Sequence, residues 1–121
     1  MEKIKFRSKQ HQEFYIATME QVRRNDVYHR ALVYLLGLTQ DTVSHFNEVF
    51  DFDTDLIKPE CLHAGWQTGG SIRVCRLALN LWNGYVEEES SSAFTPEDIF
   101  CCEFAPYFYE AIRLRYPEYN I

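Results

Sequence analysis

The sequence has no long apolar run: no stretch approaches the ~20 consecutive apolar residues that a membrane-spanning helix requires. Its first residues, MEKIKFRSKQHQ, carry charge but are followed by no apolar segment, so we expect no secretory signal. Only four cysteines are present, and without an export signal we expect them to be reduced thiols. These absences predict a cytoplasmic protein with no membrane partner.

Positive charge is also scarce. Twelve Lys and Arg residues stand against 18 Asp and Glu residues, which gives a net charge of −6. This balance disfavours nucleic acid as a partner, because the neutralisation of phosphates dominates affinity for DNA and RNA. Apolar side chains make up 46% of the chain and aromatic ones 16%, enough to sustain a hydrophobic core at this length. We therefore expect residues 1–121 to form a single domain.

Helical spacing of apolar residues dominates the pattern, and no convincing strand alternation is present. The chain is divided by start and stop signals at Ser8, Asp26, Thr39, Thr95 and Gly84. The expected helices span about 9–24, 27–36, 39–50, 59–64, 72–83, 96–102 and a last stretch ending near 115. The acid- and serine-rich segment at about 86–94 is expected to be a mobile loop. The sequence thus predicts an all-α fold, a compact single-domain bundle of about five to six helices.

A glycine-rich turn that leads into an apolar helix, QTGGSIRVCRLALNLWNG, is the most unusual stretch. Arg73, Arg76, Asn80 and Asn83 lie at spacings of three, four and three, so they form one polar stripe along this helix. The stripe begins at the helix N-terminus, where free backbone N–H groups and the helix dipole favour an anion.

An anion site at this turn is one interpretation, with Gly69 and Gly70 letting the main chain curl around a phosphate, nucleotide or carboxylate. The candidate ligand-binding residues are Gln67, Thr68, Gly69, Gly70, Ser71, Arg73, Arg76 and Asn80. The other interpretation is that Ser71 simply caps the helix and the stripe faces water or an acidic neighbour. The turn is not a Walker loop, because it lacks the lysine and the spacing of that motif.

Three acids, Asp51, Asp53 and Asp55, are spaced like the first ligands of an EF-hand loop. The match fails further on, because Leu56 replaces the glycine of the sharp turn and Leu62 replaces the bidentate glutamate. We expect a solvated acidic loop here, and the sequence predicts no metal site and no cofactor.

The cysteines give no zinc or catalytic pattern. Cys61 and His63 are close, but Cys75, Cys101 and Cys102 are scattered rather than arranged in short pairs. We interpret the four thiols as buried and inert. Because no nucleophile elbow or helical metal-ligand pattern is present either, the sequence assigns no catalytic residues and favours a non-enzymatic role.

The C-terminal stretch FCCEFAPYFYEAIRLRYPEYNI is densely aromatic. A buried stripe fits Phe104, Phe108, Ala111 and Ile112. Four tyrosines have spacings that allow them to lie partly outside the core, exposed to solvent: Tyr107, Tyr109, Tyr116 and Tyr119. Since Tyr and Arg dominate protein interfaces, this segment is either a core helix with surface hydroxyls or a binding face.

Four strings carry a family resemblance: FNEVFDF, IKPECL, GWQTGGSIRVCRLALNLWNG and DIFCCEFAPYFYEAIRLRYPEY. They resemble a family of small proteins of unknown function from Firmicutes and from their phages and mobile elements. The resemblance runs along most of the chain and is weakest at the serine-rich segment. It implies a cytoplasmic setting in a bacterium or mobile element, and it implies no catalytic residue.

Two functional hypotheses follow. The first is a small cytosolic interaction protein without catalysis, which acts on a host or defence protein on behalf of a phage or mobile element. The second is a binder of a small anionic molecule, a phosphate or nucleotide, which would use the QTGGS turn with Arg73 and Arg76.

Overall fold

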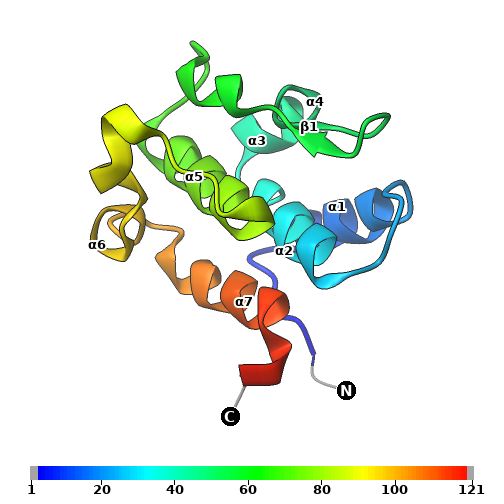
Figure 1. Ribbon diagram of the computed structural model, residues 1–121. Coiled ribbons are helices and arrows are strands. Elements are labelled where there is room, and N and C mark those ends of the chain that lie inside the picture. The colour runs from blue at the N-terminus through cyan, green and yellow to red at the C-terminus, as the bar shows by residue number, and fades with distance from the viewer. Residues whose placement is uncertain (1–2, 120–121) are drawn as a thin grey trace.

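The protein is mostly helical and has one very small sheet (Figure 1). The computed structural model describes residues 3–119. Within them lie seven α-helices, three 3-10 helices and two strands, in the order α1 (Lys9–Met19), α2 (Val27–Leu36), α3 (Gln40–Ser44), α4 (Phe46–Val49), β1 (Phe50–Asp51), β2 (Leu56–Ile57), η1 (Pro59–His63), α5 (Gly69–Asn83), η2 (Glu88–Phe94), α6 (Pro96–Ile99), α7 (Ala105–Arg115) and η3 (Pro117–Tyr119). The predicted helical class is confirmed. The predicted number of five to six helices is wrong, because the third expected helix is split in two and three short segments coil as 3-10 helices.

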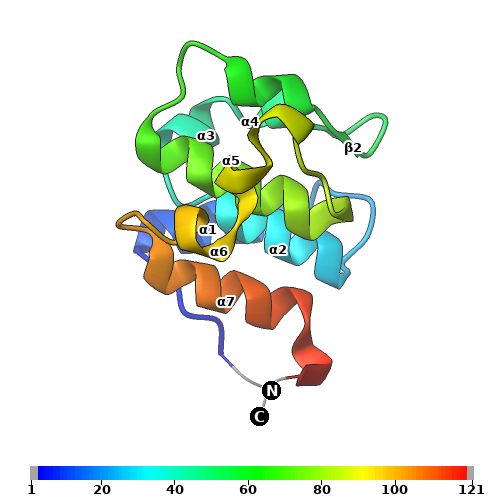
Figure 2. The same cartoon turned by 60° about the vertical axis from the view of Figure 1, so that its left-hand side comes forward.

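Helix α2 forms the centre of the fold. Its sequence VYHRALVYLL buries side chains on nearly every side, among them Leu32, Val33, Leu35 and Leu36. It packs against α1, α5 and α7, and Figure 2 shows it between α5 and α7. A helix that is apolar on most sides needs such cover, because each exposed side would leave apolar surface in water.

Capping residues begin and end the main helices as their local sequence predicts. Ser8, Asp26 and Thr39 each accept a hydrogen bond from the main-chain N–H three residues later. Gly84 ends α5 in the left-handed region, with φ 80. In the part of the chain that is described, no helix combines the length and the apolar character needed to cross a bilayer.

Two expected helices are shorter than their apolar pattern suggests. Helix α1 stops at Met19 instead of near Arg24, because the residues that follow are mostly exposed and gain no packing from another turn. The third expected helix breaks at His45, where the main chain is not helical. The His45 ring stacks on Trp66, with centroids 4.4 Å apart, and its Nδ1 lies 2.8 Å from the Asp41 carbonyl oxygen.

Residues 50–57 form a hairpin where the sequence predicted only a solvated loop. Phe50 pairs with Ile57 and Asp51 pairs with Leu56 in antiparallel register. Phe50 is fully buried, and its packing in the core holds the hairpin against the bundle. The acidic residues that follow Phe50 suggested a loop exposed to solvent, so the sequence did not indicate this contact.

A buried histidine ties this hairpin to α2. His29 Nε2 lies 2.8 Å from Asp55 Oδ1, and His29 Nδ1 lies 2.7 Å from Oδ1 of Asp26, the residue that caps α2. Trp82 of α5 covers the imidazole edge to face, at 4.9 Å between centroids. Asp55, which has a φ of 60° in the hairpin turn, therefore helps to hold the hairpin to α2 through its contact with His29.

The segment expected to be a mobile loop, about 86–94, contains the 3-10 helix η2. The chain kinks at Ser90, and Phe94 at its end is buried against Tyr85, with ring centroids 6.1 Å apart. Helical turns form here because Phe94 anchors the far end of the segment to the core.

Candidate functional site

The QTGGS turn begins α5 one turn earlier than the sequence predicted. Thr68, rather than Ser71, is the N-cap, and the two residues form a capping box in which each side chain accepts from the other's main-chain N–H. Ser71 Oγ also donates to Gln67 Oε1 at 2.7 Å. The side chains of the turn thus satisfy one another, and Gly69 and Gly70 belong to the helix.

Gly70 is required by packing inside the protein. A Cβ atom at this position would lie 2.7 Å from a ring carbon of Phe104, too close for any side chain. Phe104 is buried next to α7 and approaches the first turn of α5. This close approach explains the glycine without a bound anion.

Arg73 contacts α6 through Nε and Nη2 of its guanidinium, and its own helix through Nη1. Its Nε donates to the Asp98 carbonyl oxygen at 2.9 Å, and its Nη1 donates to the Gly69 carbonyl oxygen at 2.8 Å. Its Nη2 lies 3.4 Å from the Asp98 carboxylate. These contacts make Arg73 a brace between α5 and α6, with its charge balanced by Asp98.

A cleft of about 550 Å³ lies beside this brace and is lined by Arg73, Ser92, Thr95, Glu97, Asp98 and Cys101. Two carboxylates therefore share the cleft with the single arginine. This balance is less favourable to a phosphate than an arginine that faces only neutral donors.

Arg76 and Asn80 continue the stripe but face other neighbours. The Arg76 guanidinium lies over the Phe94 ring, 5.9 Å from its centroid. Its Nε is buried and has no hydrogen-bond partner among the described residues. Asn80 Nδ2 donates to the Tyr85 carbonyl oxygen at 3.2 Å. Most of the predicted site residues thus lie along α5, and among the described contacts Arg73 meets α6, Arg76 meets Phe94 and Asn80 meets the Tyr85 carbonyl.

The cysteines differ in exposure. Cys61 and Cys75 are buried, as the sequence predicted, whereas Cys102 is half-buried and Cys101 is exposed. The prediction of a buried Cys101 is wrong because α6 ends at Ile99, and the following bend turns this side chain outward. Within residues 3–119, no group of three or more His, Cys, Asp or Glu side chains is placed to hold a metal ion.

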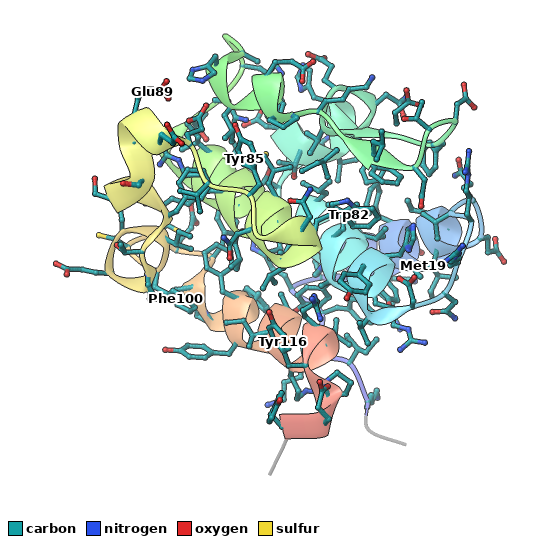
Figure 3. All side chains as sticks on the ribbon, in the orientation of Figure 1. Met19, Trp82, Tyr85, Glu89, Phe100 and Tyr116 are labelled. Carbon is teal, nitrogen blue, oxygen red and sulfur yellow. The ribbon has the colours of Figure 1, made fainter. Side chains whose placement is uncertain are left out.

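Helix α7 has one buried side and one aromatic side. Phe108 and Ala111 have no exposed surface, as the stripe predicts, whereas Ile112 of the same predicted stripe is only half-buried. On the other side Tyr109 is 68% exposed, and Tyr119, in η3 just after the helix, is 75% exposed. A groove of about 280 Å³ runs between them and is lined by Tyr109, Ile112, Arg113, Tyr116 and Tyr119. Figure 3 shows Tyr116 at the end of this helix.

Arg115 extends this aromatic surface to α2. Its guanidinium carbon lies 4.0 Å from the centroid of the Tyr28 ring and 4.5 Å from that of Tyr116. Its Nε donates to the Leu81 carbonyl oxygen at 2.8 Å. Sequence analysis missed Tyr28, because the pattern of α2 predicted burial on almost all sides. We call the continuous surface the tyrosine face: Tyr28, Tyr109, Ile112, Arg113, Arg115, Tyr116 and Tyr119.

A buried carboxylate supports the tyrosine face from beneath. Glu110 accepts two hydrogen bonds from Arg113, at 2.8 and 2.7 Å, and one from the Lys5 main-chain N–H at 2.7 Å. The hydrogen-bonded Arg113 guanidinium holds the pKa of Glu110 below its ordinary value. Burial raises the pKa of the Tyr34 phenol, whose hydroxyl donates to the Lys5 carbonyl oxygen at 2.5 Å. Both groups hold the N-terminal segment to the bundle.

A model of a protein family matches residues 1–121. The chain belongs to the family of unknown function DUF6075. Comparison with curated proteins and with solved structures finds no match. Membership agrees with the resemblance to a domain of unknown function. The bacterial and mobile-element setting stays a prediction, and the function has to be argued from the geometry.

Proposed function

We propose that this protein is a non-enzymatic interaction protein that binds a partner protein through its tyrosine face. The observation that carries the proposal is the arrangement of exposed tyrosines around a groove, next to an arginine held between two rings. Tyr and Arg are among the residues that contribute most binding energy in protein interfaces. Exposed aromatic surface gathered in one place is also typical of binding sites.

The geometry lowers the cost of binding. Arg115 is already fixed by two rings and by the Leu81 carbonyl, so an interface loses little rotamer entropy at this side chain. The groove of about 280 Å³ is large enough to receive side chains of a partner. In the mobile-element setting that the resemblance implies, the partner would be a host or defence protein.

The proposal is tested with tagged wild-type protein and two double variants. Tyr109→Ser/Tyr119→Ser removes two rings of the tyrosine face, and Ile16→Ser/Leu56→Ser is the matched control. The control residues are 54% and 59% exposed and lie on α1 and on the hairpin. Both changes replace exposed apolar area, so they are comparable in their effect on solubility.

Capture from a bacterial lysate at native salt, followed by quantitative mass spectrometry, is the measurement. We expect a specific protein to be enriched by the wild type and by the control variant. Its recovery should fall at least about tenfold with the tyrosine variant, since two interface rings contribute more than ~1.4 kcal/mol. Equal recovery by all three proteins, or no enriched protein, contradicts the proposal.

A small anionic ligand is the alternative function, and Arg76 favours it. A buried guanidinium nitrogen without a hydrogen-bond partner costs free energy unless something satisfies it, and a phosphate or nucleotide at the stripe would do so. This hypothesis predicts that a nucleotide raises the melting temperature and that Arg76→Ala abolishes the rise. A flat response across phosphate and a nucleotide panel would remove it.

A further inference from the structure

The imidazole of His29 lies between two carboxylates. Its Nδ1 is 2.7 Å from Asp26 Oδ1, and its Nε2 is 2.8 Å from Asp55 Oδ1. The histidine is 2% exposed, and the rings of Trp82 and Phe50 pack edge to face against it. His29 belongs neither to the tyrosine face nor to the polar stripe of α5, so neither proposed function uses it.

Both ring nitrogens need a hydrogen to make these contacts. An ionised carboxylate only accepts hydrogen bonds, and a neutral imidazole carries a single N–H. Asp26 Oδ1 also accepts the His29 main-chain N–H at 2.9 Å, so a proton on this oxygen would oppose two contacts. A proton on the Asp55 carboxyl would pass to the ring, because an imidazole is ordinarily a much stronger base than a carboxylate. The distances therefore fit an imidazolium that donates from both nitrogens.

The charges around the ring favour this protonated form. Among the described residues, the charged or titratable groups that face it are Asp26, Asp55, Arg24 and Tyr28, and α5 and β1 add only uncharged aromatic rings. Two carboxylates thus outweigh one guanidinium. A cavity of about 260 Å³ beside the imidazole gives water a path by which the proton can leave.

We propose that His29 is a proton-operated latch, whose imidazolium fastens the β1–β2 hairpin to α2 and whose loss of one ring proton releases the tip of the hairpin. Asp26 is fixed by its capping bond in α2, so the remaining proton stays on Nδ1. Nε2 then presents a lone pair to the Asp55 carboxylate, and an attractive contact becomes repulsive. The closed state binds one more proton than the open state, so the latch is closed on the acid side of the transition and opens as pH rises.

Little else holds the tip of the hairpin. Each strand has only two paired residues, and Phe50 anchors the base of the hairpin rather than its tip. A second link, from Arg23 Nη2 to the Asp53 carbonyl oxygen, is exposed to solvent and contributes less than the buried contact. Because Asp55 lines the same cavity as Tyr28, release of the tip widens this cavity at the border of the tyrosine face.

Nuclear magnetic resonance on the isotope-labelled full chain tests the latch between pH 5 and pH 9. Long-range proton–nitrogen correlations within the His29 ring distinguish the imidazolium from either neutral tautomer. We expect the imidazolium at pH 5 and loss of one ring proton as pH rises. The methyl signals of Leu56 and Ile57 should move in the same transition, while those of Leu79 in the core keep their native positions.

Three variants locate the proton. Asp55→Asn keeps an acceptor and tolerates the positive φ but removes the charge, so its transition should lie at least about one pH unit lower, a tenfold loss of proton affinity. The matched control Asp53→Asn removes the same charge from the exposed tip of the same hairpin, and screening should limit its shift to under about 0.3 unit. His29→Gln has no titrating ring, so its hairpin signals should show no transition.

Several results would overturn the proposal. They are a neutral ring at pH 5, a ring that does not change between pH 5 and pH 9, and hairpin signals that do not follow the ring. Equal shifts in Asp55→Asn and Asp53→Asn would also overturn it, because overall charge would then explain the transition. Movement of the Leu79 signals with those of the hairpin would indicate global unfolding instead of a latch. Should His29→Gln fail to fold by circular dichroism, the two asparagine variants still decide the matter.

Discussion

Replacing Arg73 with alanine tests whether this residue braces α5 against α6. The variant loses a half-buried hydrogen bond from Nε to the Asp98 carbonyl and an exposed one to the Gly69 carbonyl. Hydrogen bonds from charged donors contribute about 1.5–3 kcal/mol when shielded and less when exposed. The half-exposed ion pair with the Asp98 carboxylate adds about 0.2–1 kcal/mol, and alanine recovers a few tenths through helix propensity.

The expected loss in the free energy of unfolding is about 2 kcal/mol. For 121 residues, with about 2.1 cal/mol/K of unfolding entropy per residue, this corresponds to a melting temperature lower by about 8 °C. Urea unfolding followed by circular dichroism, with an unchanged slope, measures the free energy directly.

Two companion variants separate the contacts of this brace. Asp98→Asn keeps the main-chain acceptor and removes only the carboxylate charge, so it should cost less than about 1 kcal/mol. Arg73→Lys keeps the charge but cannot reach both carbonyls with one ammonium, so it should lose most of the 2 kcal/mol. The reasoning is refuted if Arg73→Ala costs under about 0.5 kcal/mol, or if Asp98→Asn costs as much as Arg73→Ala.

Two further predictions concern backbone conformation and acid stability. Gly84→Ala should lower the free energy of unfolding by about 1–2 kcal/mol, because the main chain has a φ of 80° there. The control Gly65→Ala, whose new Cβ atom would meet no atom within 4 Å, should change this free energy by under ~0.5 kcal/mol. Chemical denaturation measures both, and equal effects would contradict the prediction. Because Arg113 depresses the pKa of Glu110 in the folded state, the stability that this carboxylate contributes is present above its unfolded pKa of about 4.3 and is lost as pH falls through the lower folded value. Melting temperatures measured from pH 6 to pH 2 should therefore fall less steeply for Glu110→Gln than for the wild type, and parallel curves would disprove the assignment.

Helix boundaries were predictable where the signal is local. The caps at Ser8, Asp26 and Thr39 and the stop at Gly84 lie within one turn of the groups they satisfy. The start of α5 was misassigned because two glycines are poor helix formers and concealed its first turn. There the capping box between Thr68 and Ser71 outweighs the low propensity of the residues between them.

The partners of the candidate site residues were not predictable, because they lie far away in the sequence. Asp98 is 25 residues from Arg73, and Asp55 is 26 residues from His29. With 18 acidic residues in the chain, no local pattern says which one meets a given arginine or histidine. The sequence did predict that Tyr109, Tyr116 and Tyr119 could be exposed, but it placed Ile112 in the buried stripe, and the inclusion of Tyr28 depends on α7 packing against α2.

The central position of α2 has a consequence for synthesis on the ribosome. This helix is made early, but the helices that cover it, α5 and α7, begin at Gly69 and Ala105. Its leucines and valines therefore stay in contact with water, or with factors that bind nascent chains, until α7 has emerged as well. Folding of the bundle accordingly waits for α7, and a nascent chain stalled before this helix would expose its most apolar segment.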